Sequence, residues 1–90
     1  MEHKNLQQST LTEMVERMKA RHPDRLLIFD MDDFYSSFAD DAKTLSEVCG
    51  VTLTRTSAKD ITAQQAAFPG YELFDNLSKL KRAGIRVAIC

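Results

Sequence analysis

Cysteine is scarce in this sequence of 90 residues, which has only two. Cys49 and Cys90 lie far apart and lack Cys-x-x-Cys spacing, so neither a disulfide framework nor a zinc site is expected. Free cysteines are usually buried, and they persist in reducing compartments. We therefore predict two buried free thiols and a cytoplasmic location.

Long hydrophobic runs and a strong charge of either sign are also lacking. No apolar stretch approaches the roughly 18 residues that span a bilayer. The polar start, MEHKNLQQST, lacks the apolar core of a signal peptide. The formal net charge is −1, so no overall field attracts the chain to nucleic acid or to an anionic membrane. We expect no membrane partner, and any DNA binding by the chain alone is expected to be weak.

The composition that is present is ordinary for a globular domain, with 43% hydrophobic and 28% charged residues. Residues 1–9 are polar and aperiodic, and we predict a flexible leader there. Residues 10–90 then form one domain. No internal repeat or low-complexity segment interrupts it.

Apolar residues at helical spacing predict three helices, over residues 10–22, 36–50 and 71–84. Apolar or β-branched runs predict four strands, over residues 26–31, 51–56, 63–68 and 85–90. This order of elements predicts an α/β domain in which helices flank a small mixed sheet.

Several residues are expected to define the ends and faces of these helices. Thr10 and Glu13 have the spacing of a capping box, and Gly50 and Gly84 suit helix ends. The expected apolar face of the second helix is Phe38, Ala42, Leu45 and Val48. The expected apolar face of the third helix is Leu73, Phe74, Leu77 and Leu80.

The stretch RLLIFDMDDFYSSF, residues 25–38, ends an apolar run in three carboxylates followed by two aromatic residues. Its FDMDD part resembles the first motif of haloacid dehalogenase-like phosphatases, with Asp30 and Asp32 as the catalytic pair. It also resembles a metal-binding motif of translesion DNA polymerases. Both kinds of enzyme need further acidic residues on a larger framework, which 90 residues do not supply. We therefore predict neither an enzyme nor a metal site.

A third resemblance extends over nearly the whole chain. Six fragments occur in the order found in the N-terminal mismatch-recognition domain of the MutS family: HPDRLLIF, DFYSSF, DDAK, LT, FPGYELFDNLSKL and VAIC. The chain resembles that domain, called domain I, and the resemblance implies its α/β fold. The phosphate-binding motif Gly-x-x-x-x-Gly-Lys-Ser/Thr is absent, so this chain is expected to lack the ATP-binding part of such proteins.

The resemblance also implies a DNA contact at the aromatic pair. In the family, the Phe of Phe-Tyr-Glu inserts into the duplex and stacks on the mispaired base, which the Glu then hydrogen-bonds. By position, Phe34 is the stacking residue, Tyr35 follows it, and Ser36 replaces the Glu. We expect DNA contacts from these three residues and from Arg55 and Lys59. The stacking role requires an exposed Phe34.

Two substitutions in the same loop oppose DNA binding. Asp32 stands where the family has a turn glycine, and Asp30 stands where its members carry a basic residue. Aspartate tolerates the left-handed backbone less readily than glycine, and added carboxylates repel phosphates.

Two functions therefore remain open. The first is a non-catalytic module, without a cofactor, that binds mismatched or distorted DNA weakly. The second is a protein-interaction or structural module that kept the fold and lost mismatch recognition. Flanking domains or a protein partner are expected in either case.

Overall fold

Strand β1 (Leu26–Asp30) is the apolar run LLIFD, and it lies inside the sheet rather than at an edge. The structure is a computed structural model that describes residues 13–55 and 64–90. Every β1 residue except Asp30 is buried, as in a strand that is covered on both faces. β1 therefore divides the hydrophobic core into two parts.

One mixed sheet contains five strands in the order β3-β4-β2-β1-β5. The other strands are β2 (Phe34–Phe38), β3 (Leu53–Arg55), β4 (Gln64–Pro69) and β5 (Val87–Ile89). β5 is parallel to β1, and the remaining pairs are antiparallel. The helices are residues 13–21, α2 (Ala39–Cys49), the short 3-10 helix η2 (Gly70–Glu72) and α3 (Leu73–Arg82). The predicted fold class, a small mixed sheet flanked by helices, is confirmed.

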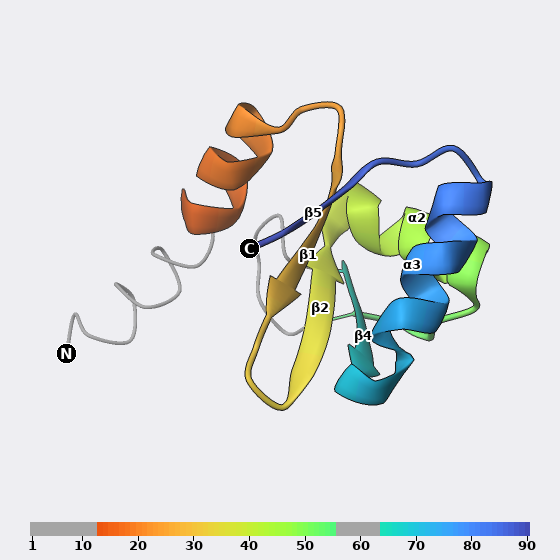
Figure 1. Cartoon of the computed structure of the whole chain (residues 1–90). Coiled ribbons are helices and arrows are strands. Elements are labelled where there is room, and N and C mark those ends of the chain that lie inside the picture. Colours follow the sequence, from red (N-terminus) through yellow and green to blue (C-terminus); the bar gives the residue numbers. More distant parts are fainter. Residues whose placement is uncertain (1–12, 56–63) are drawn as a thin grey trace, which may run out of the picture.

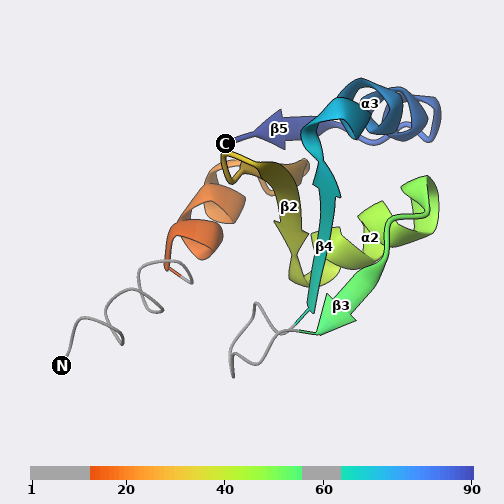
Figure 2. The same cartoon turned by 90° about the horizontal axis from the view of Figure 1, so that it is seen from below.

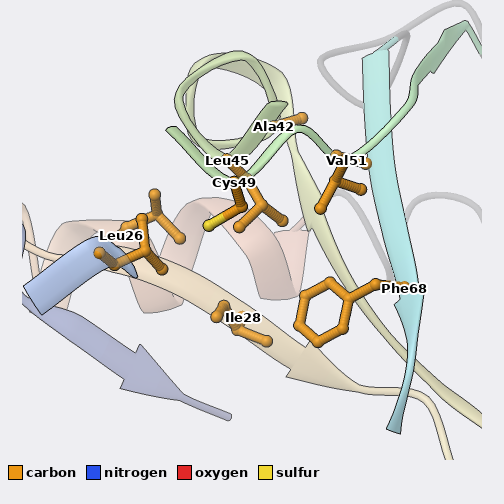
Figure 3. Packing of buried hydrophobic residues seen from close by; sticks show 9 residues of the cluster. Leu26, Ile28, Ala42, Leu45, Cys49, Val51 and Phe68 are labelled. Atoms are coloured by element: carbon orange, nitrogen blue, oxygen red, sulfur yellow. The ribbon is translucent and has the colours of Figure 1, made fainter. Parts of the chain in front are cut away.

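Helices cover both faces of this sheet (Figures 1 and 2). α2 and α3 pack on one face, and helical residues 13–21 pack on the other. Leu26 and Ile28 of β1 belong to the cluster beneath α2 and α3, which Figure 3 shows. Leu27 and Phe29 alternate with them and belong to the cluster beneath residues 13–21. In the two described ranges, no helix has both the length and the apolar character needed to cross a bilayer.

The helix predicted over residues 36–50 is wrong at its start, because residues 34–38 form β2. β2 lies between β1 and β4, so half of its pairing comes from a strand some thirty residues later in the chain. Phe38 does not share the helix face of Ala42 as predicted. Its ring instead packs edge-on against Phe29, with the ring centroids 5.8 Å apart.

Both predicted glycine helix ends are confirmed. Gly50 has φ 75° and its N–H donates to the Ser46 carbonyl at 2.9 Å, which closes α2. Gly84 follows α3 with φ 77°. Left-handed values such as these favour glycine because it has no Cβ. The Thr10 capping residue and the leader predicted over residues 1–9 lie outside the described residues.

The apolar face of α3 differs from the prediction at one position. Leu73, Leu77 and Leu80 pack toward the core, but Phe74 is 79% exposed. Asn76 is buried in its place. Positions 73, 76, 77 and 80 have the spacing of one helical face, whereas position 74 lies about 100° away around the axis.

Where the pairing of β1 with β2 ends, the backbone groups of Leu27 form hydrogen bonds with side chains instead of with backbone groups of β2. Leu27 is buried; its N–H donates to Asp41 Oδ2 at 3.1 Å, and its carbonyl accepts from Ser37 Oγ at 2.6 Å. Lys19 Nζ donates to Asp41 Oδ1 at 3.0 Å and to the Arg25 carbonyl at 2.6 Å. Asp41 therefore connects the start of α2 to β1 and to the N-terminal helix.

The two cysteines are free thiols in different surroundings. Cys49 is buried as predicted, and its Sγ lies 3.6 Å from the Asn76 carbonyl. Burial raises the pKa of the Cys49 thiol, an effect that nearby Lys79 opposes and Asp75 reinforces. Cys90 is exposed, so the prediction that it is buried is wrong. It follows β5, an edge strand of the sheet, and edge positions have fewer covering neighbours.

Candidate nucleic-acid interface

The turn between β1 and β2 presents the predicted stacking residue. Met31 N–H donates to the Phe34 carbonyl at 2.9 Å and so closes the turn, and Asp33 N–H donates to the Met31 carbonyl at 2.9 Å. Asp32 lies at the centre with φ 74°. Its N–H donates to Asp30 Oδ1 at 2.9 Å. Asp32 therefore has a left-handed backbone at the position where the family has a turn glycine.

Phe34 is the first residue of β2 and is 37% exposed. It pairs with Pro69, the last residue of β4. The turn before it projects at the end of the sheet, at the bottom of Figure 1. The exposure that a stacking residue requires is therefore present at this position.

Tyr35 lies on the opposite side of the sheet from Phe34, because successive residues of a strand face opposite sides. Ser36 lies on the same side as Phe34 but further along β2, where it pairs with Phe29 of β1. The Tyr35 ring stacks on Phe68 with centroids 5.7 Å apart and an interplanar angle of 25°. A Cβ atom at Gly70 would lie 3.8 Å from this ring. Ser36 has no exposed surface, and its hydroxyl accepts a hydrogen bond from Gln65 Nε2 at 2.8 Å. In this conformation Tyr35 anchors the strand, and Ser36 supports it from inside.

The carboxylates of Asp30, Asp32 and Asp33 surround the turn, and all three residues are exposed. Asp30 Oδ1 already accepts the N–H of Asp32. Within residues 13–55 and 64–90, no group of three or more His, Cys, Asp or Glu residues is arranged to hold a metal ion. The chemistry of this turn is therefore local negative charge beside an exposed aromatic ring.

The structure does not bring Arg55 to Phe34. Arg55 pairs with Gln64 at one end of β4, whereas Phe34 pairs with Pro69 at the other. Five residues of strand separate these positions by about 16 Å. Lys59, the other predicted phosphate contact, lies outside the described residues.

Basic residues gather instead at the end of α3. Lys79, Lys81 and Arg82 occupy its last turn, are exposed, and complement the negative end of the helix dipole. Arg86 forms an exposed ion pair with Asp24, with Nη1 and Oδ2 3.7 Å apart. Such an exposed pair contributes little to stability.

Two further aromatic residues were not predicted as site residues. Tyr71 is 86% exposed and Phe74 is 79% exposed, the highest values among the large hydrophobic residues that the structure describes. The signal was available in the sequence, because Phe74 departs from the spacing of Leu73, Leu77 and Leu80. An aromatic residue outside the apolar face of an amphipathic helix is expected to face solvent.

Sequence comparisons match this chain to one family. A family model described as MutS domain I matches residues 9–90. The DNA mismatch repair protein MutS of Salinibacter ruber is 49% identical over 75 residues, which cover 82% of this chain and 8% of that protein. MutS of Bacteroides thetaiotaomicron is 47% identical over 74 residues, covering 81% of this chain and 9% of the relative. MutS of Flavobacterium psychrophilum is 38% identical, covering 100% and 10% respectively.

The resemblance predicted from the six sequence fragments is confirmed by these matches. This chain spans about a tenth or less of the length of these curated relatives.

Proposed function

Because the chain belongs to the MutS domain I family, we propose that it is a non-catalytic module that binds mismatched or otherwise distorted duplex DNA. Its relatives are named DNA mismatch repair proteins. In the proposal Phe34 stacks on a base, and Tyr35 fixes the strand that presents it. Ser36 supports this strand from its buried position, and Arg55 and Lys59 contribute phosphate contacts.

The observation that carries this proposal is the exposure of Phe34 on a turn at the end of the sheet. Stacking of an aromatic ring on a base is worth about 1–3 kcal/mol and tolerates any base. A mispaired step unstacks at lower cost than a paired one, so a protruding ring favours it. A ring on the first residue of β2, directly after a hydrogen-bonded turn, is well placed for that insertion.

The affinity of the chain alone is proposed to be weak. Three exposed carboxylates surround Phe34, and the formal net charge of the chain is −1. DNA binding depends mainly on basic residues that neutralise phosphates, and neither ion pair among the described residues brings a basic side chain to an aspartate of this turn. We propose that flanking domains or a protein partner supply the remaining affinity, and that the module acts in the cytoplasm without a cofactor.

Fluorescence anisotropy of labelled duplexes tests the proposal. The full chain is titrated against a matched duplex and against one with a single mismatch, at about 20 and 150 mM salt. We expect low-salt binding in the micromolar range, tighter for the mismatched duplex. Phe34→Ala is expected to weaken mismatch binding by about 5- to 150-fold, the equivalent of one lost stacking contact.

Leu53→Ala is the matched control, because Leu53 on β3 is 38% exposed, nearly the same as Phe34, and lies away from the turn. It is expected to leave both affinities unchanged. The DNA proposal fails if neither duplex binds at tens of micromolar and low salt, or if the two variants behave alike.

A second candidate function is a protein-interaction module that kept the fold. The observation that favours it is the acidic turn, since Asp30, Asp32 and Asp33 would face phosphates in a DNA complex. If the chain is a protein-interaction module, substituting all three aspartates by asparagine is expected not to produce DNA binding. If the DNA proposal is right, the same triple variant binds duplex more tightly than the wild type.

A further inference from the structure

Tyr71 and Phe74 form an exposed aromatic pair where β4 leads through η2 into α3. Side chains three residues apart are neighbours on one side of a helical segment. Neither ring belongs to either core cluster. Large apolar side chains that are grouped and exposed in this way mark an interaction surface.

The aromatic pair continues into a stripe along one side of α3. Ser78 and Lys81 follow Phe74 by four and seven residues, so they lie on the same side of the helix, and both are exposed. We call Tyr71, Phe74, Ser78 and Lys81 the aromatic stripe. About 10 Å of helix separates Phe74 from Lys81, the length of about three stacked nucleotides at 3.4 Å each.

Lys81 is the one charged member of the aromatic stripe, and it is exposed. Both acidic residues of the segment, Glu72 and Asp75, line a hollow of about 410 Å³ between the end of α2 and α3. Lys79 also lines that hollow. The aromatic stripe combines two exposed rings with one cation, and one exposed carboxylate, that of Asp75, adjoins it four residues after Tyr71. The rings and the cation suit an anionic partner with flat, apolar faces.

The aromatic stripe begins beside the strand end that carries Phe34. Phe34 pairs with Pro69, and Tyr71 is only two residues further along the chain. Figures 1 and 2 both show η2 near the turn between β1 and β2. A nucleic acid bound at Phe34 would therefore have the start of the stripe within reach.

We propose that the aromatic stripe binds an unpaired nucleic-acid strand, with bases stacked on Tyr71 and Phe74 and a phosphate at Lys81. Base faces are hidden inside a paired duplex, so rings on a convex helix select bases that are already unpaired. This inference rests on the proposed DNA-binding function and extends its target to distorted DNA with extruded or single-stranded nucleotides.

The test measures the affinity of the full chain for labelled dT12 and for a matched duplex. The double variant Tyr71→Leu/Phe74→Leu keeps apolar bulk but removes both aromatic rings. It is expected to weaken dT12 binding by at least about fivefold, the effect of one stacked base, and to leave matched-duplex binding unchanged. Lys81→Gln is expected to weaken dT12 binding and to lower the magnitude of its salt slope by about 1.

Lys43→Gln, on exposed α2 surface, is the matched control for Lys81→Gln and is expected to have no effect. Because Tyr71 and Phe74 are largely exposed, the double variant is expected to keep the wild-type circular dichroism spectrum and melting temperature. These two measurements separate a lost contact from a lost fold.

The inference is overturned if dT12 does not bind at about 100 μM and low salt, or if the leucine variant binds it as well as the wild type. Tolerance of leucine would indicate an apolar protein contact instead. Phe34→Ala keeps the two proposals separable. If it leaves mismatch binding unchanged, the Phe34 proposal fails, whereas the stripe is judged on dT12 alone.

Discussion

Asp32 adopts a backbone conformation that costs an L-residue energy, at φ 74° in the turn before Phe34. Left-handed geometry costs about 1–2 kcal/mol for most residues and less for aspartate. Part of that cost is offset because the Asp32 N–H donates to Asp30 Oδ1. The turn that presents Phe34 is thus formed without the glycine that suits it best, and a residual strain remains at one position.

Asp32→Gly is therefore expected to stabilise the chain. Relief of the positive φ outweighs the greater freedom of glycine in the unfolded state by about 0.5 kcal/mol. For a domain of this size, that raises the melting temperature by roughly 2–4 °C. Thermal denaturation followed by circular dichroism measures the shift.

Asp33→Gly is the matched control, since Asp33 is an exposed neighbour whose φ is not positive. It is expected to lower the melting temperature slightly, because it adds unfolded-state freedom and relieves nothing. Equal shifts in the two variants would contradict a strained Asp32.

At the scale of elements, the junction of β2 and α2 depends on Asp41. β2 leaves β1 at Phe38, and the buried Leu27 N–H then has Asp41 Oδ2 as its acceptor. Lys19 approaches the same carboxylate from the opposite layer. One side chain therefore completes the sheet and connects it to two helices.

Asp41→Ala is expected to destabilise the chain by about 1–3 kcal/mol, because it leaves a buried N–H without an acceptor. Asp41→Asn is expected to cost less, since an amide oxygen can still accept from Leu27 while the ion pair with Lys19 is lost. Urea denaturation gives both free energies of unfolding. Lys19→Met removes the ion pair and the hydrogen bond to the Arg25 carbonyl but leaves the acceptor of the Leu27 N–H in place. A loss as large as that of Asp41→Ala would contradict this division of roles.

At the scale of the whole molecule, the two faces of the sheet differ in the size of the hydrophobic cluster that covers them. α2 and α3 together cover one face. Counting only residues 13–55 and 64–90, their cluster contains nine buried residues, whereas the cluster beneath residues 13–21 contains four. Cys49 lies in the larger cluster, where burial raises its thiol pKa. Because the folded chain binds the Cys49 proton more tightly than the unfolded chain, its stability depends on pH in the alkaline range.

The sign of this link follows from the two states. As pH rises past the unfolded thiol pKa of about 8.5, the unfolded chain loses the Cys49 proton first, so unfolding is favoured. The stability from the protonated thiol is complete below that pH and is lost above it. We expect the melting temperature to fall more between pH 7.5 and 9.5 for the wild type than for Cys49→Ala. Equal falls would refute the link.

The sequence alone determined the family, the fold class and most elements. Six fragments in order indicate the family, and the glycines at 50 and 84 mark helix ends, because local backbone geometry requires them. The left-handed backbone of Asp32 could likewise be predicted, because the family has a turn glycine at that position. The exposure of Phe74 could also have been predicted, because it depends only on helical periodicity.

Only the tertiary structure decided the roles within DFYSSF. β2 was missed because its pairing with β4 is not visible in a local pattern, and this pairing sets which residues face inward. It exposes Phe34, stacks Tyr35 on Phe68 and buries Ser36 beside Gln65. It also moves Arg55 to the far end of β4. Local sequence determines which conformations are available, whereas partners distant in the chain determine which side chains remain accessible to a ligand.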